Sequence, residues 1–223
     1  MSPELIKALY PLGYLSTVAF GLRFFIQWLY SEVKGQSLVI RPFWWLSLVG
    51  NLLLLTHSLI QMQFHVSLVQ AINAVISWRN LDLMKPGTGQ KSLGFTLGLM
   101  ALAILSVASF FIFTGQEWFH APNATSPISM SWHILGLIGL ILFSSRFVVQ
   151  WWDAEWQHQS VLGLSFWSMS IAGGLLSILY FAELHDTVNL IGPSLGMIPY
   201  IRNFMLLIKH KSEHKSEQKK RVA

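Results

Sequence analysis

Apolar stretches of the length needed to cross a bilayer dominate this chain. A membrane-spanning helix needs about 20 mostly apolar residues. Seven such stretches lie at 8–30, 43–61, 64–82, 93–113, 132–152, 162–182 and 187–208. With 53% hydrophobic and 11% charged residues, the chain has too many apolar side chains for a soluble domain, in which about 25% of residues are charged. We therefore predict an all-α integral membrane protein with seven transmembrane helices.

The distribution of Lys and Arg predicts the orientation in the membrane. One face would carry Lys34, Arg41, Lys85, Lys91 and the basic tail 209–223, and the other Lys7 and the cation-free loop 114–131. By the positive-inside rule, the amino terminus is then outside and the carboxyl terminus cytoplasmic. Residues 1–7 lack the features of a signal peptide, so we expect the first span to be retained. We interpret the tail as a solvated flank or a site for anionic headgroups, and we expect no nucleic-acid partner.

An internal repeat divides the sequence. Residues 12–84 align with 135–207 at a constant offset of 123, without a gap, and nineteen of the 73 pairs are identical. Each copy contains three spans, and the stretch 93–113 belongs to neither copy. The linker span makes both copies enter the membrane in the same direction, which predicts a 3+1+3 arrangement of parallel repeats. Transporters place their substrate sites at the interface of such repeats.

Polar residues inside the spans indicate an inward-facing stripe. Gln70, Asn73, Ser77 and Asn80 follow helical spacing and share one face of the third span. Ser47 and Asn51 on the second span extend this polar interior. Small and polar side chains of this kind either hydrogen-bond between packed helices or line a substrate cavity, and the sequence leaves both interpretations open.

Four arginines fall at similar predicted depth. Arg23 and Gln27 lie one turn apart, as do Arg146 and Gln150, while Arg79-Asn80 and Arg202-Asn203 close the third span of each copy. An arginine at the centre of a span costs about 2.5 to 3.5 kcal/mol on insertion scales. Glu32, Glu155 or Asp82 could pair with Arg23 and Arg146 as ordinary ionic anchors. Alternatively, the four guanidinium groups form a cytoplasm-facing site for a phosphorylated or anionic lipid headgroup, since guanidinium matches phosphate geometry.

Other side chains point to no catalytic chemistry. The chain has no Cys, and it contains no nucleophile elbow, phosphate-binding Gly-rich loop or zinc motif. We therefore predict no catalytic residue, no metal and no cofactor. Six tryptophans fall near predicted span ends and are typical of an interfacial aromatic belt, with sugar stacking as the alternative: Trp28, Trp44, Trp45, Trp151, Trp152 and Trp167.

Both copies carry Arg-Phe-x-x-Gln-Trp, a following Glu, Gln-Ser, Phe-Trp-x-x-Ser and a closing Arg-Asn. This pattern resembles the lipid A biosynthesis N-terminal domain family, which is similar to the three-helix repeats of PQ-loop and SWEET-like proteins. The matching signature positions are Arg23, Gln27, Trp28, Arg79, Asn80, Arg146, Gln150, Trp151, Arg202 and Asn203. The resemblance implies a multi-pass protein of the Gram-negative inner membrane.

The family includes the N-terminal region of some lipid-A-disaccharide synthases, which join UDP-2,3-diacylglucosamine to 2,3-diacylglucosamine 1-phosphate. Beyond the two copies and the linker span, only short loops and the tail remain here, too little for a transferase domain. We therefore expect no enzyme activity from this chain alone. The resemblance favours a module that binds an anionic glycolipid and presents it to, or moves it for, a separate glycosyltransferase. The alternative, from another class, is a SWEET-like transporter of a sugar or lipid-linked sugar.

Overall fold

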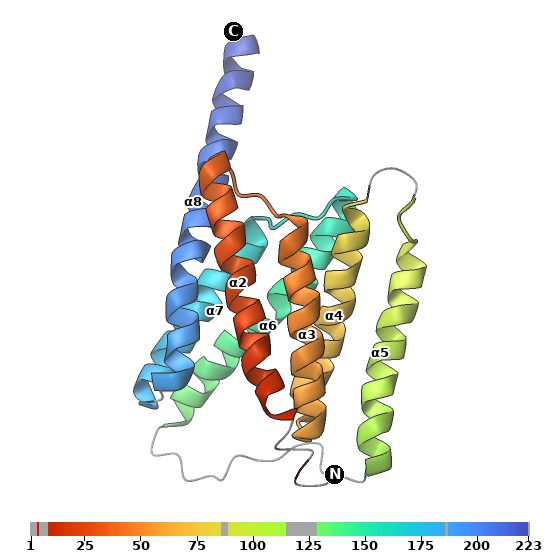
Figure 1. Ribbon diagram of the computed structural model, residues 1–223. Helices are drawn as coiled ribbons and strands as arrows, with labels where there is room; N and C mark the ends of the chain where they lie inside the picture. Colours follow the sequence, from red (N-terminus) through yellow and green to blue (C-terminus); the bar gives the residue numbers. More distant parts are fainter. Residues whose placement is uncertain (1–3, 5–8, 86–88, 115–128, 186, 223) are drawn as a thin grey trace. The chain divides into compact units, whose positions relative to one another are not determined.

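The described part of the protein folds into long α-helices. The structure is a computed structural model that describes residues 4, 9–85, 89–114, 129–185 and 187–222. Within these residues it contains seven long helices (Figure 1): α2 Pro11–Lys34, α3 Arg41–Ile60, α4 Phe64–Leu83, α5 Leu93–Thr114, α6 Met130–Gln157, α7 Leu164–Glu183 and α8 Thr187–Val222. Each predicted apolar stretch coincides with one helix, so the seven predicted helices are confirmed. The largest difference is in α8, which continues through most of the predicted tail.

Six of these helices are long and apolar enough to cross a membrane, namely α2, α3, α5, α6, α7 and the Leu190–Glu213 part of α8. Helix α4 is not among them, because residues such as Asn73, Arg79 and Asp82 lower its hydropathy. The chain is thus built as a multi-pass membrane protein, and a crossing by α4 stays a prediction. The predicted orientation in the membrane also stays a prediction, because Lys7 and 115–128 lie outside the described residues.

The helices group into two compact units that do not coincide with the two sequence copies. Unit 1 comprises Met1–Arg23, Ile40–Thr125 and Ala154–Ser160, and unit 2 comprises Phe24–Val39, Ser126–Asp153 and Val161–Ala223. The division falls inside α2 and near the end of α6. Residues 24–39, from the first copy, therefore belong to the unit that contains most of the second copy. Residues 154–160, from the second copy, belong to the unit that contains most of the first.

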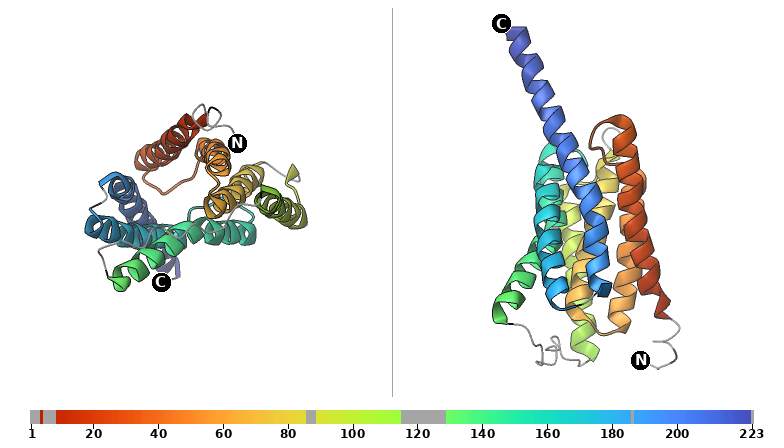
Figure 2. Two further views of the ribbon diagram at one scale, coloured as in Figure 1. Left: turned by 90° about the horizontal axis from the view of Figure 1, so that it is seen from below. Right: turned by 90° about the vertical axis from the view of Figure 1, so that its left-hand side faces the viewer.

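In unit 1, helix α4 lies between α3 and α5 and packs against both (Figure 2). Ala71 of α4 is buried together with Val107 and Phe111 of α5. The ring of Phe64 meets that of Phe111 edge to face, with centroids 5.3 Å apart. These apolar contacts hold α5, which belongs to neither sequence copy, against the first copy.

In unit 2, helix α7 packs against α8 and closely approaches α6. A Cβ at Gly173 of α7 would lie 2.9 Å from the backbone nitrogen of Phe143 and 3.0 Å from the carbonyl oxygen of Gly139. Only glycine allows this approach. The equivalent glycine of the first copy, Gly50, faces the ring of Phe20, 2.5 Å from where its Cβ would be. In both copies this glycine therefore leaves room for the first helix of the copy, for the backbone of α6 at Gly173 and for a side chain of α2 at Gly50.

The Phe-Trp pairs at 43–44 and 166–167 also repeat their geometry. Their rings meet edge to face with centroids 4.9 Å and 5.0 Å apart, and both tryptophans are 0% exposed. The predicted aromatic belt is therefore wrong for these two tryptophans and for buried Trp151, which pack inside the protein. Trp45 and Trp152 are 53% and 63% exposed, as the belt requires.

Replacing Gly173 by Ala should destabilise the fold. The added methyl group meets backbone atoms of α6 that cannot rotate away, and overpacking of this kind costs about 1 to 3 kcal/mol. Gly98 of α5 is the matched control, because nothing lies within 4 Å of its Cβ position. Gly98→Ala should raise the free energy of unfolding by about 0.5 to 1 kcal/mol through helix propensity. Thermal unfolding in detergent, monitored by circular dichroism, measures the stability of both variants. Equal changes in their unfolding temperatures would contradict the close contact between Gly173 and α6.

Candidate functional site

A polar cluster in unit 2 joins α2 and the loop after it to α8. Gln27 Nε2 donates to Asn203 Oδ1 and to Ser31 Oγ, both at 2.9 Å. Asn203 Nδ2 donates back to Gln27 Oε1 at 3.2 Å, and Ser37 Oγ donates to Asn203 Oδ1 at 3.0 Å. Gln27 and Asn203 are both 0% exposed. The signature Gln and Ser of the first copy thus bind the signature Asn of the second.

A corresponding cluster occurs in unit 1. Ser160 Oγ donates to Asn80 Oδ1 at 2.7 Å, and Trp44 Nε1 donates to Ser160 Oγ at 2.6 Å. Asn80 Nδ2 donates to the Ile76 carbonyl at 2.9 Å, as Asn203 Nδ2 does to the carbonyl one turn before it, at 2.8 Å. Since Ser160 and Asn80 are the equivalents of Ser37 and Asn203, the contact between the copies is made in both directions.

Arg79 forms a buried ion-pair network beside this second cluster. Its Nε and Nη2 donate to the two carboxylate oxygens of Glu155 at 2.6 Å and 2.8 Å. Its Nη1 donates to Asp82 Oδ2 at 2.8 Å and to the Lys91 carbonyl at 2.7 Å. The Arg79 and Glu155 side chains are only 4% and 10% exposed. A fork-to-fork pair of this geometry is among the strongest that proteins form.

The equivalent ion pair in unit 2 is partly exposed. Arg202 donates to both carboxylate oxygens of Glu32, through Nε and, at 2.9 Å, through Nη2. These two side chains are 44% and 31% exposed. The sequence predicted Glu32, Glu155 or Asp82 as partners for Arg23 and Arg146, but these acids pair with Arg79 and Arg202. Glu32 is nine residues beyond Arg23, about 13 Å along the helix, which is too far for a contact on one helix.

Arg23 and Arg146 occupy equivalent aromatic surroundings but differ in hydrogen bonding. The Arg23 guanidinium carbon lies 4.5 Å from the ring centre of Phe20 and 5.5 Å from that of Phe43. Arg23 Nη1 donates to Ser47 Oγ at 2.9 Å. Both arginines are buried, at 6% and 2% exposed.

The Arg146 guanidinium is surrounded by aromatic rings. Its carbon lies 3.6 Å from the ring centre of Phe143, and four further ring centres, those of Phe24, Phe147, Phe166 and Tyr200, lie 5.1 to 5.5 Å away. Within the described chain, its buried Nε and Nη1 have no hydrogen-bond partner. Ser170, the equivalent of Ser47, donates instead to a backbone carbonyl of its own helix. The ring faces supply a cation–π attraction but no acceptor for these N–H groups.

The predicted polar stripe is present in the first copy only in part. Ser77 and Asn80 are buried, while Gln70 and Asn73 are half-buried. Asn51 Nδ2 donates to Ser77 Oγ at 3.1 Å, so this part of the stripe bonds α3 to α4. The remaining signature amide, Gln150, donates to the Val161 carbonyl at 2.9 Å and ties α6 to its following loop.

The second copy fills the same space with an aromatic ring. Gly174, Gly196 and Tyr200 stand where the first copy has Asn51, Asn73 and Ser77. A Cβ at Gly196 would lie 2.9 Å from the Tyr200 ring, so Gly196 makes room for it. The sequence pattern did not single out the rings around Arg146. Phe143 could have been found, because it and Phe20 are identical in the alignment of the copies and lie one turn before the arginines.

The fold and these clusters define a duplicated, multi-pass helical membrane protein. The Lipid A Biosynthesis N-terminal domain family matches residues 12–82 and 135–205, as two tandem copies. The chain belongs to this family. No solved structure matches it.

Curated relatives extend the likeness over nearly the whole chain. It is 37% identical over 211 residues to a lipid-A-disaccharide synthase of Chlamydia pneumoniae. Synthases of the same name from Chlamydia felis and Chlamydia trachomatis are 35% and 34% identical over 215 residues. Each alignment covers 92% of this chain and 34% or 35% of the relative, so the chain spans about a third of the length of these proteins.

Replacing Glu155 by Gln should be far more harmful than replacing its equivalent, Glu32. Loss of the Glu155 charge leaves Arg79 buried with its charge only partly compensated, and breaking buried pairs costs about 3 to 5 kcal/mol. The Glu32 pair is open, so the loss there should be small. Thermal unfolding of Glu155→Gln and Glu32→Gln in the same detergent compares them directly. A similar loss of unfolding temperature in both would contradict the asymmetry.

Proposed function

We propose that the protein is a membrane-embedded module of lipid A biosynthesis that binds an anionic glycolipid. It would present or translocate this lipid for a separate glycosyltransferase of the lipid-A-disaccharide-synthase type. Support comes from membership of the lipid A biosynthesis family in two copies and from similarity to synthases over 92% of the chain. The activity, the substrates and the partner transferase are parts of this proposal.

Arg146 is the observation that carries the proposal. A buried arginine in a membrane-spanning helix costs free energy, and the unpaired Nε and Nη1 of Arg146 add the penalty of unmet hydrogen bonds. A phosphate group removes both penalties, because it brings charge and several acceptors that a guanidinium can bind in parallel. No carboxylate of the described chain forms an ion pair with Arg146, whereas Arg79 and Arg202 are already paired.

The remaining predicted site residues take different parts in this proposal. Arg79, Asn80, Arg202, Asn203 and Gln27 act as positioning residues, since they join the copies. In unit 1, Gln70 and Asn73 are half-buried. Arg23 and Asn51 bond to neighbouring side chains inside unit 1, and Gln150 bonds to the loop after α6 inside unit 2, so these residues support the fold of their own units.

We also place the protein in the bacterial inner membrane, with its amino terminus outside and its carboxyl terminus in the cytoplasm. The basic end of α8 would then meet anionic headgroups of the cytoplasmic leaflet. Three-helix copies entering the membrane in the same direction, as in PQ-loop and SWEET-like proteins, complete this arrangement. An accessibility test of thiols introduced at each end of the helices would measure the orientation.

The second candidate function is transport of a sugar or lipid-linked sugar by movement of one copy against the other. The duplication favours it, because many transporters consist of such repeats. Flux of a labelled sugar into proteoliposomes, without a partner transferase, would favour this candidate. Formation of lipid A disaccharide that depends on both this protein and the transferase would favour the first.

Native mass spectrometry of co-purified lipid tests the proposed function. The wild-type protein should retain an anionic glycolipid, and Arg146→Gln should lower its amount about tenfold or more, since hydrogen bonds to charged groups contribute about 1.5 to 3 kcal/mol each. Arg146→Lys should also bind less, because an ammonium lacks the fork geometry. Arg41→Gln, at the exposed start of α3, is the control and should retain the lipid.

Two results would overturn the proposed function. One is recovery of bulk phospholipid alone from the wild-type protein. The other is retention of the glycolipid by Arg146→Gln at the wild-type level. Unfolding temperatures of all variants, measured in the same detergent, separate loss of binding from loss of folding.

A further inference from the structure

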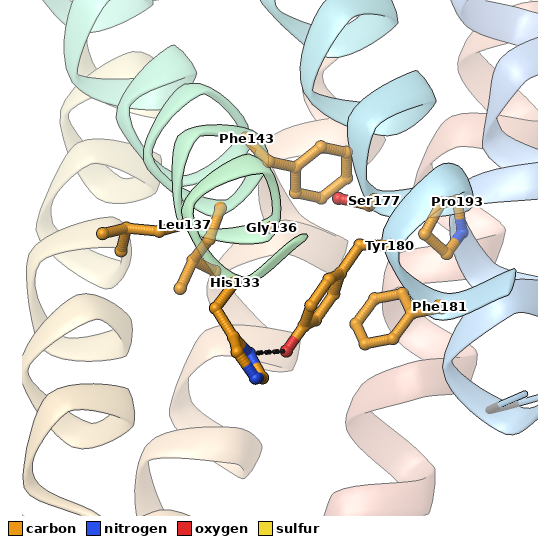
Figure 3. A pocket seen from close by; sticks show the side chains of 9 residues that line it. His133, Gly136, Leu137, Phe143, Ser177, Tyr180, Phe181 and Pro193 are labelled. Carbon is orange, nitrogen blue, oxygen red and sulfur yellow. Dashed lines mark hydrogen bonds between the residues drawn. The ribbon is translucent and has the colours of Figure 1, made fainter. Parts of the chain in front are cut away.

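A cavity of about 460 Å³ opens in unit 2 between the start of α6, the end of α7 and the first part of α8. Ligand sites commonly have volumes of about 300 to 1,000 Å³. Figure 3 shows the bonded pair His133 and Tyr180 at one end of this cavity and Phe143 at the other. His133 and Phe143 are ten residues apart on α6, so the cavity follows about 15 Å of that helix.

The wall of the cavity combines apolar and polar groups. Leu137, Leu140, Phe143 and Phe181 supply apolar surface. His133 Nδ1 and the Tyr180 hydroxyl lie 3.2 Å apart, and Ser177 adds a second hydroxyl. Aromatic rings next to hydroxyl and imidazole groups suit a sugar ring, which has apolar faces and a polar edge.

The His-Tyr pair recurs in the first copy with its two residues exchanged. Tyr10 and His57 stand at the positions equivalent to His133 and Tyr180. Their rings meet edge to face with centroids 5.2 Å apart, compared with 6.0 Å for His133 and Tyr180. At the position of Ser177, however, the first copy has Leu54. At the positions of Leu140, Phe181 and Pro193 the first copy has the polar residues Thr17, Ser58 and Gln70, so the two copies carry their polar groups at different positions.

Phe143 separates the cavity from Arg146. It lines the cavity, and its ring centre is 3.6 Å from the Arg146 guanidinium carbon. Phe143 is half-buried, whereas Arg146 is 2% exposed. Phe143 is therefore the residue of the cavity wall whose ring lies against the guanidinium.

We propose that this cavity holds the phosphorylated sugar headgroup of a glycolipid, with its phosphate on Arg146. This inference rests on the proposed function and assigns the substrate class and the place of binding. Phe143 rotates away and the phosphate accepts hydrogen bonds from Arg146 Nε and Nη1. His133, Ser177 and Tyr180 bind the sugar hydroxyls, and the leucines contact the first carbons of the acyl chains.

The absence of native Cys permits a direct test with single introduced thiols. Ser177→Cys places a thiol in the cavity. Ser92→Cys is the control, because Ser92 is exposed outside the cavity and lies just before the membrane-spanning helix α5, where a water-soluble reagent can reach it. The rate of modification by a water-soluble, negatively charged thiol reagent is measured with and without 2,3-diacylglucosamine 1-phosphate.

The phosphorylated probe should slow modification of Ser177→Cys about tenfold when present at ten times its Kd, as mass action requires. The same lipid without its phosphate should protect much less. Modification of Ser92→Cys should not respond to either lipid. Leu140→Cys, at a second position of the cavity wall, should be protected in the same way as Ser177→Cys. Agreement between the two variants shows that the protection does not come from a folding defect in one of them.

The outcomes separate the two proposals. If the wild-type protein binds the probe through Arg146 but neither cavity thiol is protected, the cavity assignment is wrong and the proposed function stands. If the wild-type protein binds no anionic glycolipid, both fail. Equal protection by the lipid with and without phosphate would overturn the role of Arg146 in this cavity.

Discussion

Polar groups inside membrane-spanning helices must find partners within the protein, because lipid offers none, and an unmet group costs several kcal/mol. Here each copy supplies hydrogen-bond partners for polar side chains of the other. The Gln and Ser of the first copy bind Asn203, and the Ser of the second copy binds Asn80. The glutamates follow the same rule, each paired with the arginine of the other copy. Neither copy could bury these groups alone, so the duplication is a condition of the fold.

Equivalent positions of the two copies carry different residues where they make no contact between the copies. The first copy uses an Asn51 to Ser77 hydrogen bond, whereas in the second Gly196 makes room for Tyr200. This ring contributes to the aromatic surroundings of Arg146. The second copy holds the cavity and Arg146, whose buried Nε and Nη1 have no partner in the described chain. Under the proposed function, this copy would bind the ligand.

The sequence predicted the helices well because their boundaries follow from hydrophobic length and from turn residues, which are local properties. The repeat also followed from the sequence, since equivalent residues recur at a fixed offset. Partners could not be predicted in this way. An alignment of the copies shows that Glu32 and Glu155 are equivalent, but not that each contacts the other copy. The burial of Trp44 and Trp167 was missed for the same reason, because position near a helix end does not show what packs over it.

The central claim is that the Ser of each copy contacts the Asn of the other, and cross-linking tests it most directly. In this Cys-free chain, thiols are introduced as Ser37→Cys with Asn203→Cys, and as Ser160→Cys with Asn80→Cys. A short bifunctional thiol reagent is added, and the chain is then cut at an engineered protease site between the copies. We predict that both pairs keep the two fragments joined on a denaturing gel. Fragments that separate, while the same-copy pair Ser37→Cys with Asn80→Cys is linked within its fragment, would contradict the account.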